Sequence, residues 1–310
     1  MQPKNTSEKI ELADLKTAGI DLSIVVVSYN TADLIGVCLK SLEAVDGCEK
    51  EIFVVDNASK DGTVEFVRKN FQSISLIAND NNLGFAAANN QALSLCRGKY
   101  ILLLNPDMEF LPSSFQFISS FMEANPQIGL AGIKLINPDG SPQESYSCKY
   151  PGQKYTTYEL KNLKGSIAWV LGAGMVFRSD LIRKLGGFDE DFFVYGEDQD
   201  LCLRIRKAGY EIGYIETGLM VHLGGQSERK TPSESLWRKK ILAEFIFYRK
   251  HYLPRTVSLI ARSNLMKASW RMATLKLLLP FYRDKIACEQ KLAKYRAISR
   301  VISSEILNRG

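Results

Sequence analysis

The first hundred residues alternate between short apolar, β-branched runs and segments whose apolar residues recur at helical spacing. A short β-branched run is typical of a buried strand, and recurrence every three or four residues is typical of a helix that buries one side. The predicted strands are 22–28, 51–56, 74–78 and 98–104, and the predicted helices are 33–42, 63–70 and 85–96. A helix between successive strands lets them run parallel, so we predict an α/β fold, a mainly parallel sheet with helices on both faces.

The first strand-to-helix loop narrows the range of ligands. Residues 28–33 contain no glycine. The GxGxxG of a dinucleotide site and the GxxxxGK[ST] of a phosphate loop both need glycines here, because the backbone must approach a phosphate closely. We therefore expect neither an NAD-dependent dehydrogenase nor a P-loop kinase.

Polar residues crowd the positions where three predicted strands end. They are Tyr29 and Asn30, Asp56 and Asn57, and Asn105 and Asp107. In open α/β sheets, ligands bind at the carboxyl ends of the strands. Asp56 can accept a hydrogen bond from a pyrimidine ring there, or it can be a turn residue ahead of the helix at 63–70.

Residues 82–89 combine a glycine turn with small side chains. Gly84 and the alanines after it allow the backbone to come close to a ligand. Asn82 and Asn89 can donate and accept hydrogen bonds in the same place, or they can cap the neighbouring helix.

Two residues have the chemistry to hold a divalent cation. Asp107 follows a predicted buried strand on a turn stiffened by Pro106. Its carboxylate can bind a cation that bridges substrate phosphates, or the Pro-Asp pair can simply end the strand. His222, one of only two histidines, can bind metal or phosphate, or it can be structural.

Glu197 and Asp198 form an acidic pair at the start of a predicted helix, 198–208. The helix dipole favours acidic side chains in a first turn, which accounts for one of them without any function. Alternatively, one is a general base that takes a proton from an attacking hydroxyl, its pKa raised by the aromatic run 192–195. Since a base must reach its substrate, this alternative predicts an accessible carboxylate.

The N-terminal residues and the cysteines bear on the compartment. Residues 1–21 mix charges with few consecutive apolar positions, and the chain has no run of about 20 apolar residues. These patterns predict a cytoplasmic protein without a signal peptide or a membrane-spanning helix. The six cysteines form no CxxC pair, which favours reduced thiols over a disulfide or metal site.

The net charge of +6 is divided unevenly along the chain. Residues 1–227 carry 21 Lys and Arg against 28 Asp and Glu, whereas residues 228–310 carry 19 against 6. We therefore predict three parts, an N-terminal tail at 1–21, a main domain at 22–227, and a basic extension at 228–310.

The extension is predicted to be mostly helical, with helices at 233–252 and 283–307 and breaks at Pro254 and Pro280. Its charge suits an anionic membrane surface on the inner face of the plasma membrane, where the extension would bring the active site to a lipid-linked acceptor. The alternative is a solvated helical extension that only packs against the main domain. We expect no nucleic-acid partner, because no nucleic-acid-binding motif accompanies the charge.

Short motifs that are weak one by one occur in a specific order. They are Val25 to Asn30 (VVVSYN), Val54 to Ser59 (VVDNAS), Asn82 to Asn89 (NLGFAAAN), Leu102 to Asp107 (LLLNPD), Gly186 to Asp189 (GGFD), Gly196 to Asp198 (GED), and Val221-His222. This succession, over residues 22–227, resembles the family 2 glycosyltransferases of GT-A fold. More narrowly, it is similar to the bacterial rhamnosyltransferase-like branch that builds cell-surface polysaccharide.

The resemblance implies an inverting transfer of a sugar from a nucleotide sugar. It also implies that Asp56 contacts the pyrimidine or purine ring of the nucleotide. The implied nucleotide-sugar-binding residues are Tyr29, Asn30, Asp56, Asn57, Asn82, Gly84, Asn89, Asn105 and Asp107. The family's metal motif, usually Asp-x-Asp, falls on residues 105–107 and keeps only its last carboxylate, so Asp107 and His222 are the implied ligands of Mg²⁺ or Mn²⁺. Asp198 is the implied base, with Glu197 near the acceptor or the leaving group.

The resemblance also suggests substrates. The first candidate donor is dTDP-rhamnose, which would give L-rhamnose to a saccharide or lipid-linked saccharide acceptor. The same fold with a UDP-hexose or UDP-N-acetylhexosamine donor is an alternative. A third is a non-catalytic scaffold that binds a sugar nucleotide, which the single carboxylate at residues 105–107 favours and the presence of both Asp198 and His222 disfavours.

Overall fold

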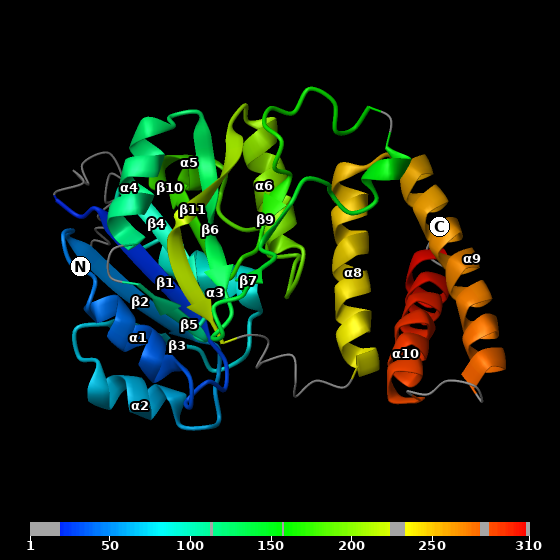
Figure 1. The fold of residues 1–310 in the computed structure, drawn as a ribbon, viewed down its shortest axis with the longest axis horizontal. Coiled ribbons are helices and arrows are strands. Elements are labelled where there is room, and N and C mark those ends of the chain that lie inside the picture. Colours follow the sequence, from blue (N-terminus) through cyan, green and yellow to red (C-terminus); the bar gives the residue numbers. More distant parts are fainter. Residues whose placement is uncertain (1–18, 112–113, 157, 224–232, 280–284, 308–310) are drawn as a thin grey trace, which may run out of the picture.

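The computed structural model describes residues 19–111, 114–156, 158–223, 233–279 and 285–307, and within them one large sheet is flanked by helices (Figure 1). Its first part contains four parallel strands, in the order β3-β2-β1-β4. These strands are β1 (Leu22–Ser28), β2 (Lys50–Asp56), β3 (Ser75–Ala78) and β4 (Tyr100–Leu104). The parallel sheet predicted from the strand and helix alternation is therefore confirmed, with strand ends shifted by one or two residues.

The sheet continues beyond β4 with strands from the second half of the chain. The order there is β10-β6-β11-β5, and β7 pairs with β6. The bounds are β5 (Met108–Phe110), β6 (Ile128–Ile136), β7 (Pro142–Gln143), β10 (Gly174–Arg178) and β11 (Glu211–His222). β10 runs antiparallel to both β4 and β6, whereas β11 is parallel to β6. β8 (Tyr146–Ser147) and β9 (Trp169–Val170) form a separate antiparallel pair.

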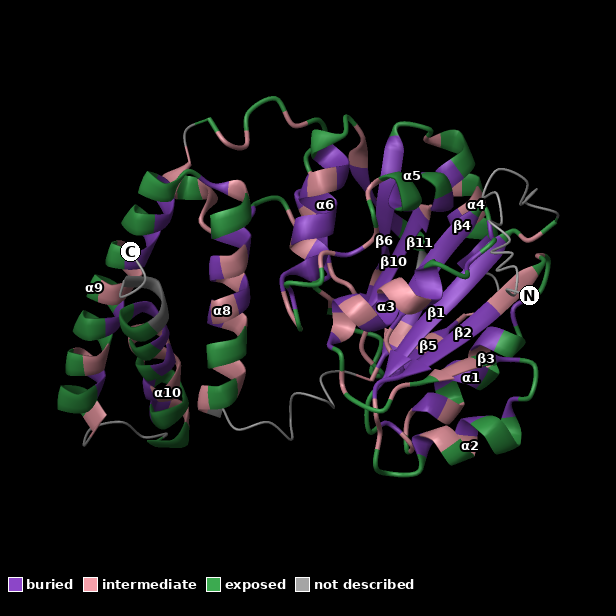
Figure 2. Cartoon of the chain, turned by 180° about the vertical axis from the view of Figure 1, so that it is seen from behind, coloured by how far each residue is buried: buried purple, intermediate pink, exposed green. Residues whose placement is uncertain are grey.

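Helices cover both faces of the sheet. On one face lie α1 (Ile35–Glu43), α2 (Thr63–Asn70) and α4 (Ser114–Ala124), and on the other lie α3 (Phe85–Leu93), α5 (Ser179–Lys184) and α6 (Glu197–Lys207). Successive side chains of a strand point to opposite faces, so Ile24 and Val26 of β1 join the first core and Val25 joins the second. Figure 2 shows the central strands buried throughout, as β-branched runs covered on both sides should be.

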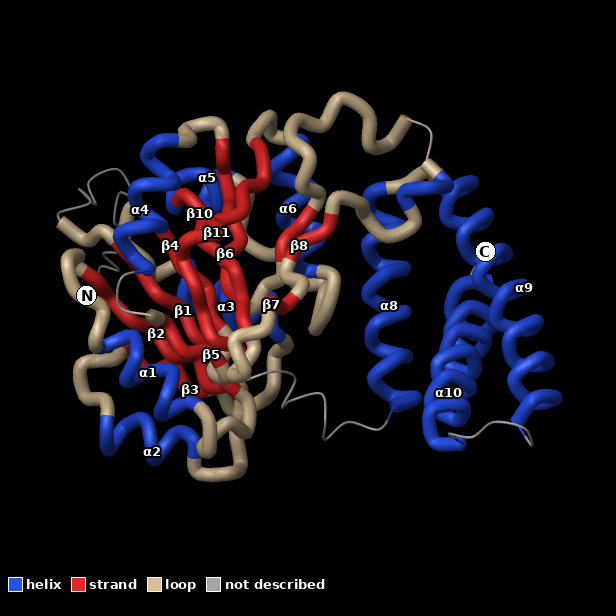
Figure 3. Tube along the Cα trace, viewed as in Figure 1, coloured by secondary structure: helices blue, strands red, loops and turns tan. Residues whose placement is uncertain are grey.

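The C-terminal part is helical, as predicted (Figure 3). Its helices are α8 (Ser233–His251), α9 (Pro254–Leu278) and α10 (Lys285–Val301), followed by a π-helical turn at Ile302–Leu307. Pro254 begins α9 instead of only ending α8, because a proline at the first helical position has no hydrogen bond to lose. Residues 1–18, Pro280, residues 283–284 and the predicted boundary at 227–228 lie outside the described residues.

The C-terminal helices share a core with the main domain. α8 lies between the sheet and the other two C-terminal helices (Figures 1 and 2). Phe247 of α8, Ile260 of α9 and Leu203 of α6 belong to one buried cluster. A short 3₁₀ turn, Gln153–Tyr155, lies in the loop between β8 and β9 that contributes Tyr150 to the same cluster.

Two further expectations can be compared with the structure. All six cysteines are free thiols, as predicted. Of the helices in the described ranges, none combines the length and apolar character that a bilayer crossing requires.

Candidate active site

Asp56 is the last residue of β2 and lies opposite Ser28, the last residue of β1. Its side chain is buried, and each carboxylate oxygen accepts one hydrogen bond. Ser28 Oγ donates to Oδ2 at 2.9 Å, and the backbone N–H of Ser59 donates to Oδ1 at 2.8 Å. A carboxylate oxygen can accept two hydrogen bonds, so Asp56 is held in place with acceptor capacity left for a ligand.

Asn30 joins the loop after β1 to the loop after β2. Its backbone N–H donates to Ser59 Oγ at 2.8 Å, and its Oδ1 accepts from the backbone N–H of Lys60 at 2.8 Å. The residue adopts φ 54, in the left-handed region that asparagine tolerates better than most side chains. The adjacent Tyr29 is 49% exposed, so its ring is open to a ligand at this edge of the sheet.

Asn57 organises the loop that precedes α3. Its Nδ2 donates to Asn82 Oδ1 and to the carbonyl oxygen of Gly84, both at 3.0 Å, while its Oδ1 accepts from the backbone N–H of Leu83 at 2.9 Å. Asn89, buried on α3, donates from Nδ2 to the carbonyl oxygen of Phe85 at 2.8 Å. The structure therefore shows these predicted ligand-binding amides in contact with the protein's own chain.

Gly84 allows two loops to meet. It has φ 88 and ψ 170, and a Cβ atom at this position would lie 2.5 Å from the carbonyl oxygen of Phe193. The neighbouring N–H of Phe85 donates to that same oxygen at 2.7 Å. The segment that leads into Glu197 and Asp198 is thereby docked on the loop held by Asn57.

Asp107 and His222 meet although they are far apart in sequence. The pairing of β5 with β11 places Met108 opposite His222, and the N–H of Leu223 donates to the carbonyl oxygen of Asp107. Both side chains are buried, with His222 Nε2 3.4 Å from Asp107 Oδ1. His222 Nδ1 lies 2.7 Å from Gln143 Oε1.

This pair fits a divalent cation. An amide oxygen only accepts hydrogen bonds, so Nδ1 is the donor to Gln143. In the tautomer that carries its only ring proton on Nδ1, the imidazole presents the lone pair of Nε2 to the carboxylate. Two acceptors this close repel one another unless a proton or a cation lies between them. Carboxylate oxygen suits Mg²⁺ and Mn²⁺, and imidazole is a ligand of first-row transition-metal ions. In the described part of the chain, no third His, Cys, Asp or Glu joins them, so substrate oxygens and water would have to complete the coordination.

Glu197 and Asp198 lie in the first turn of α6 and are both buried. Asp198 Oδ1 accepts from the N–H of Gln199 at 2.8 Å, and its Oδ2 accepts from the N–H of Gly172 at 3.3 Å. Glu197 Oε2 finds no hydrogen-bond partner among the described residues. The expectation of an accessible carboxylate is wrong for this structure, because the surrounding loops leave Asp198 only 8% exposed.

Burial changes the acid strength of both groups. Loss of hydration is the largest cause for each, since it disfavours the charged form. It raises the pKa of Asp198 to about 6, against the lowering effect of its backbone hydrogen bonds. It also raises the pKa of Glu197 to about 8, with the charge of Asp198 as the second cause. A carboxylate in this range can take up a proton near neutral pH.

One loop connects the two halves of the site. Gly172 donates to Asp198, and the carbonyl oxygen of the adjacent Ala173 accepts from the N–H of Asn105 at 3.2 Å. Asn105 is two residues before Asp107. The acidic pair of α6 and the Asp107–His222 pair are therefore fixed relative to one another through residues 172–173, which the sequence motifs had not singled out.

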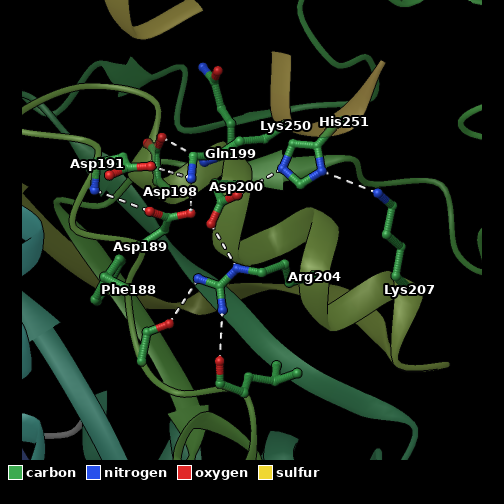
Figure 4. A network of polar contacts seen from close by, with 12 residues as sticks. Phe188, Asp189, Asp191, Asp198, Gln199, Asp200, Arg204, Lys207, Lys250 and His251 are labelled. Carbon is green, nitrogen blue, oxygen red and sulfur yellow. Dashed lines mark hydrogen bonds and ion pairs between the residues drawn. The ribbon is translucent and has the colours of Figure 1, made fainter. Parts of the chain in front are cut away.

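A second network, which sequence patterns did not reveal, ties α6 to α8 (Figure 4). Asp200 Oδ1 accepts from His251 Nε2 and its Oδ2 accepts from Arg204 Nε, both at 2.7 Å. Burial alone would raise the pKa of Asp200, but these two donors lower it below its ordinary value. Lys250 adds an ion pair to Asp189 at 2.8 Å. Only the four-residue spacing of Asp200 and Arg204 could have been read from the sequence.

Comparison with known proteins gives the family. The model of glycosyl transferase family 2 matches residues 23–186, and a model described as the N-terminal domain of galactosyltransferase matches residues 152–224. One relative, the N-acetylglucosaminyl-diphospho-decaprenol L-rhamnosyltransferase of Mycobacterium tuberculosis, is 25% identical over 245 residues, covering 69% of this chain and 80% of the relative. Rhamnosyltransferase WbbL of Escherichia coli is 27% identical over 241 residues, covering 70% of this chain and 89% of the relative.

Solved structures show the same fold. The mannosyltransferase PcManGT from Pyrobaculum calidifontis, in complex with GDP-Man and Mn²⁺, superposes with a TM-score of 0.57 at 19% identity, covering 93% of this chain and 88% of that one. Residues 1–349 of S. aureus TarS superpose with a TM-score of 0.52 at 17% identity, covering 93% and 74%. The expected GT-A fold with a helical C-terminal part is confirmed. The chain is a glycosyltransferase that is similar to rhamnosyltransferases, and it belongs to glycosyl transferase family 2.

Proposed function

We propose that this enzyme is an inverting, metal-dependent transferase that moves L-rhamnose from dTDP-L-rhamnose to a saccharide or lipid-linked saccharide in cell-surface polysaccharide synthesis. The observation that carries the proposal is the connection of Asp198 to Asp107 and His222 through residues 172–173. It supports a site with a base on one side and a diphosphate-binding group on the other. The names of the rhamnosyltransferase relatives support the choice of sugar.

The nucleotide would lie across the ends of β1 and β2. Asp56 would accept a hydrogen bond from the ring N–H of thymine, because Ser28 and Ser59 hold its carboxylate while leaving acceptor capacity. Tyr29, exposed beside it, would stack on the base. Uracil offers the same ring N–H, so this contact alone does not separate dTDP from UDP donors.

Asp198 would take the proton of the acceptor hydroxyl, which would have to reach the 8% of this residue that stays exposed. The acceptor oxygen then forms a bond to the anomeric carbon from the face opposite the departing group, and the bond from that carbon to the phosphate oxygen breaks, which inverts the configuration. A single base is enough for this displacement, without a covalent intermediate. Asp107 and His222 would hold Mg²⁺ or Mn²⁺, which supplies positive charge to the leaving diphosphate when bound.

Release of nucleoside diphosphate tests the proposal. Wild-type protein is assayed with dTDP-L-rhamnose, UDP-glucose and UDP-N-acetylglucosamine, with Mn²⁺ and a saccharide acceptor. We expect the highest kcat/KM for dTDP-L-rhamnose. Asp198→Asn should lower kcat about 100-fold or more, because it removes the base. Asp107→Ala should make turnover depend on a much higher Mn²⁺ concentration.

Asp180→Asn is the matched control. Asp180 is an exposed carboxylate on α5 that pairs only with Lys184 among the contacts described, so this variant makes the same change in charge away from the site. Turnover of Asp198→Asn equal to that of Asp180→Asn would refute the base assignment. A higher kcat/KM for either UDP sugar would refute the donor assignment while leaving the mechanism in place.

A further inference from the structure

A cavity lies among the three C-terminal helices. Its volume is about 200 Å³, and it is lined by Trp237, Lys240 and Glu244 of α8, Lys267 of α9, and Lys294 and Tyr295 of α10. Sites for whole drug-sized ligands are usually larger, at about 300–1,000 Å³. The cavity therefore suits one functional group of a ligand, such as a phosphate or pyrophosphate.

The lining carries a net positive charge. Three ammonium groups face one carboxylate, that of Glu244, which accepts a hydrogen bond from Tyr248 at 3.1 Å. Lys294 Nζ lies 4.2 Å from the centre of the Trp237 ring, and Lys240 Nζ lies 5.9 Å from it. The indole thus helps to hold two cations at the cavity, since cations are attracted to an aromatic face.

The cavity adjoins the segment that carries the acidic pair. Lys240, one of its lining residues, places its Nζ 4.9 Å from the centre of the Tyr195 ring. Tyr195 is three residues before Asp198. One helical turn further along α8, Ala243 lies against Gly196: a Cβ added to this glycine would be 3.5 Å from the Ala243 Cβ. A group bound in the cavity is therefore near the segment that leads into Asp198, the residue that would serve the acceptor under the proposed function.

We propose that this cavity binds the phosphate or pyrophosphate group of the acceptor, and that Lys267 and Lys294 are its principal cationic contacts. The inference rests on the proposed transferase function for the identity of the ligand. It accounts for three lysines gathered on three different helices, with aromatic and apolar side chains between them. Hydrogen bonds from ammonium groups to phosphate oxygens are among the strong ones.

Binding of inorganic pyrophosphate to the full chain tests the cavity directly. The titration is done by isothermal titration calorimetry in EDTA, which removes divalent cations and so suppresses cation-assisted binding at Asp107 and His222. We expect Lys267→Gln with Lys294→Gln to weaken binding at least about ten-fold, because each charged hydrogen bond is worth roughly that factor. Replacing the same two residues by arginine should retain binding, because the charge remains. The arginine variant also separates loss of the site from loss of the fold.

A matched control removes two charges from the same helices. Lys276 of α9 and Lys285 of α10 are exposed and do not line the cavity, so changing both to glutamine should leave pyrophosphate affinity within about two-fold. Equal weakening in the control and the cavity variant would overturn the proposal, because only the general charge of the helices would then matter. Absence of pyrophosphate binding by wild-type protein would overturn it as well.

Kinetics and vesicle binding identify the source of the phosphate. The cavity variant, Lys267→Gln with Lys294→Gln, should raise the KM for the acceptor over its wild-type value. This increase should be at least ten-fold larger for a pyrophosphate-linked saccharide than for the same saccharide without pyrophosphate. Vesicles of phosphatidylglycerol should bind the cavity variant and the control alike. If only the vesicle binding responds to the cavity lysines, the ligand is a membrane headgroup and the acceptor assignment is wrong. Failure of wild-type turnover with every donor would refute the proposed function, while the pyrophosphate titration still decides whether the cavity binds phosphate.

Discussion

Replacement of Gly84 by alanine adds only a methyl group, but it should strongly destabilise the folded protein. Gly84 has φ 88 and ψ 170, a region that is essentially reserved for glycine and costs other residues about 1–3 kcal/mol. The new Cβ would also lie 2.5 Å from the carbonyl oxygen of Phe193. Real Cβ atoms do not come so close to a backbone oxygen, so the Phe193 segment must move.

The size of the effect follows from what that movement breaks. It removes the hydrogen bond from Phe85 N–H to Phe193, worth about 1 kcal/mol, in addition to the backbone strain. Gly62→Ala is the matched control. Gly62 has φ 87 and ψ 9, and a Cβ added there would have no atom within 4 Å among its described surroundings, so only a left-handed penalty of about 1–2 kcal/mol applies. We expect Gly84→Ala to be destabilised by about 2 kcal/mol more than Gly62→Ala.

Urea unfolding followed by circular dichroism measures this difference. The entropy that alanine removes from the unfolded chain is the same in both variants and cancels. Since the displaced segment leads into Glu197 and Asp198, Gly84→Ala should also lower kcat for sugar transfer, whereas Gly62→Ala should not. Equal stability of the two variants, within about 0.5 kcal/mol, would show that the contact between Gly84 and Phe193 is unimportant.

Three further predictions concern the buried carboxylates. Burial, and then the charge of Asp198, raises the pKa of Glu197 from 4.5 to about 8. Between these two pH values Glu197 is ionised in the unfolded chain but protonated in the folded protein. The free energy of unfolding therefore falls as pH rises, by up to about 1.4 kcal/mol per pH unit. Glu197→Gln should therefore gain stability over wild type in urea unfolding at pH 8 and show no gain at pH 4. The pKa of Asp198, raised to about 6, predicts that kcat/KM falls as pH drops below 6, and the small residual activity of Asp198→Asn should lack this acid limb in a pH–rate profile. His251→Ala should lower the free energy of unfolding by about 2 kcal/mol near neutral pH, because it removes a hydrogen-bond donor from the buried Asp200. As a control, Lys239→Ala on the exposed face of α8 should have a negligible effect. Asp200 has a lowered pKa, so its ionised side chain stabilises the fold above its ordinary pKa of 3.8, and this stabilisation is lost as pH falls. The destabilisation by His251→Ala, measured by chemical denaturation, should therefore become smaller below pH 4.

Much of the fold could be predicted from local patterns. β1, β2 and β4 are runs of apolar and β-branched residues, and such runs form buried strands wherever helices cover both faces. α1 and α3 end at other residues than predicted because a helix end depends on caps and packing as well as on periodicity. The antiparallel β10 between β4 and β6 was not foreseen, since a strand's own sequence does not name its neighbours.

Part of the candidate site could also be predicted from local patterns, and part of it could not. The order of polar residues after β1, β2 and β4, and the acidic pair that opens α6, were readable from the sequence because each follows a recognisable local element. The identity of the family also followed from that order, and the match to glycosyl transferase family 2 confirms it. The side chains of Asn57, Asn82 and Asn89 looked like ligand contacts, and their bonds to the chain's own atoms became visible only with the loops in place.

Which of these residues act together depends on the packing of elements that are distant in sequence. Asp107 and His222 are more than a hundred residues apart and meet through the pairing of β5 with β11. Asp200 and His251 meet because α8 packs on α6 through a shared hydrophobic core. Such contacts depend on the closure of long loops and on packing summed over many side chains, and neither is encoded in a window of a few residues. The residue types at the ends of the strands can be read directly from the chain, whereas their partners, their burial and their acid strength follow from the packing of distant elements.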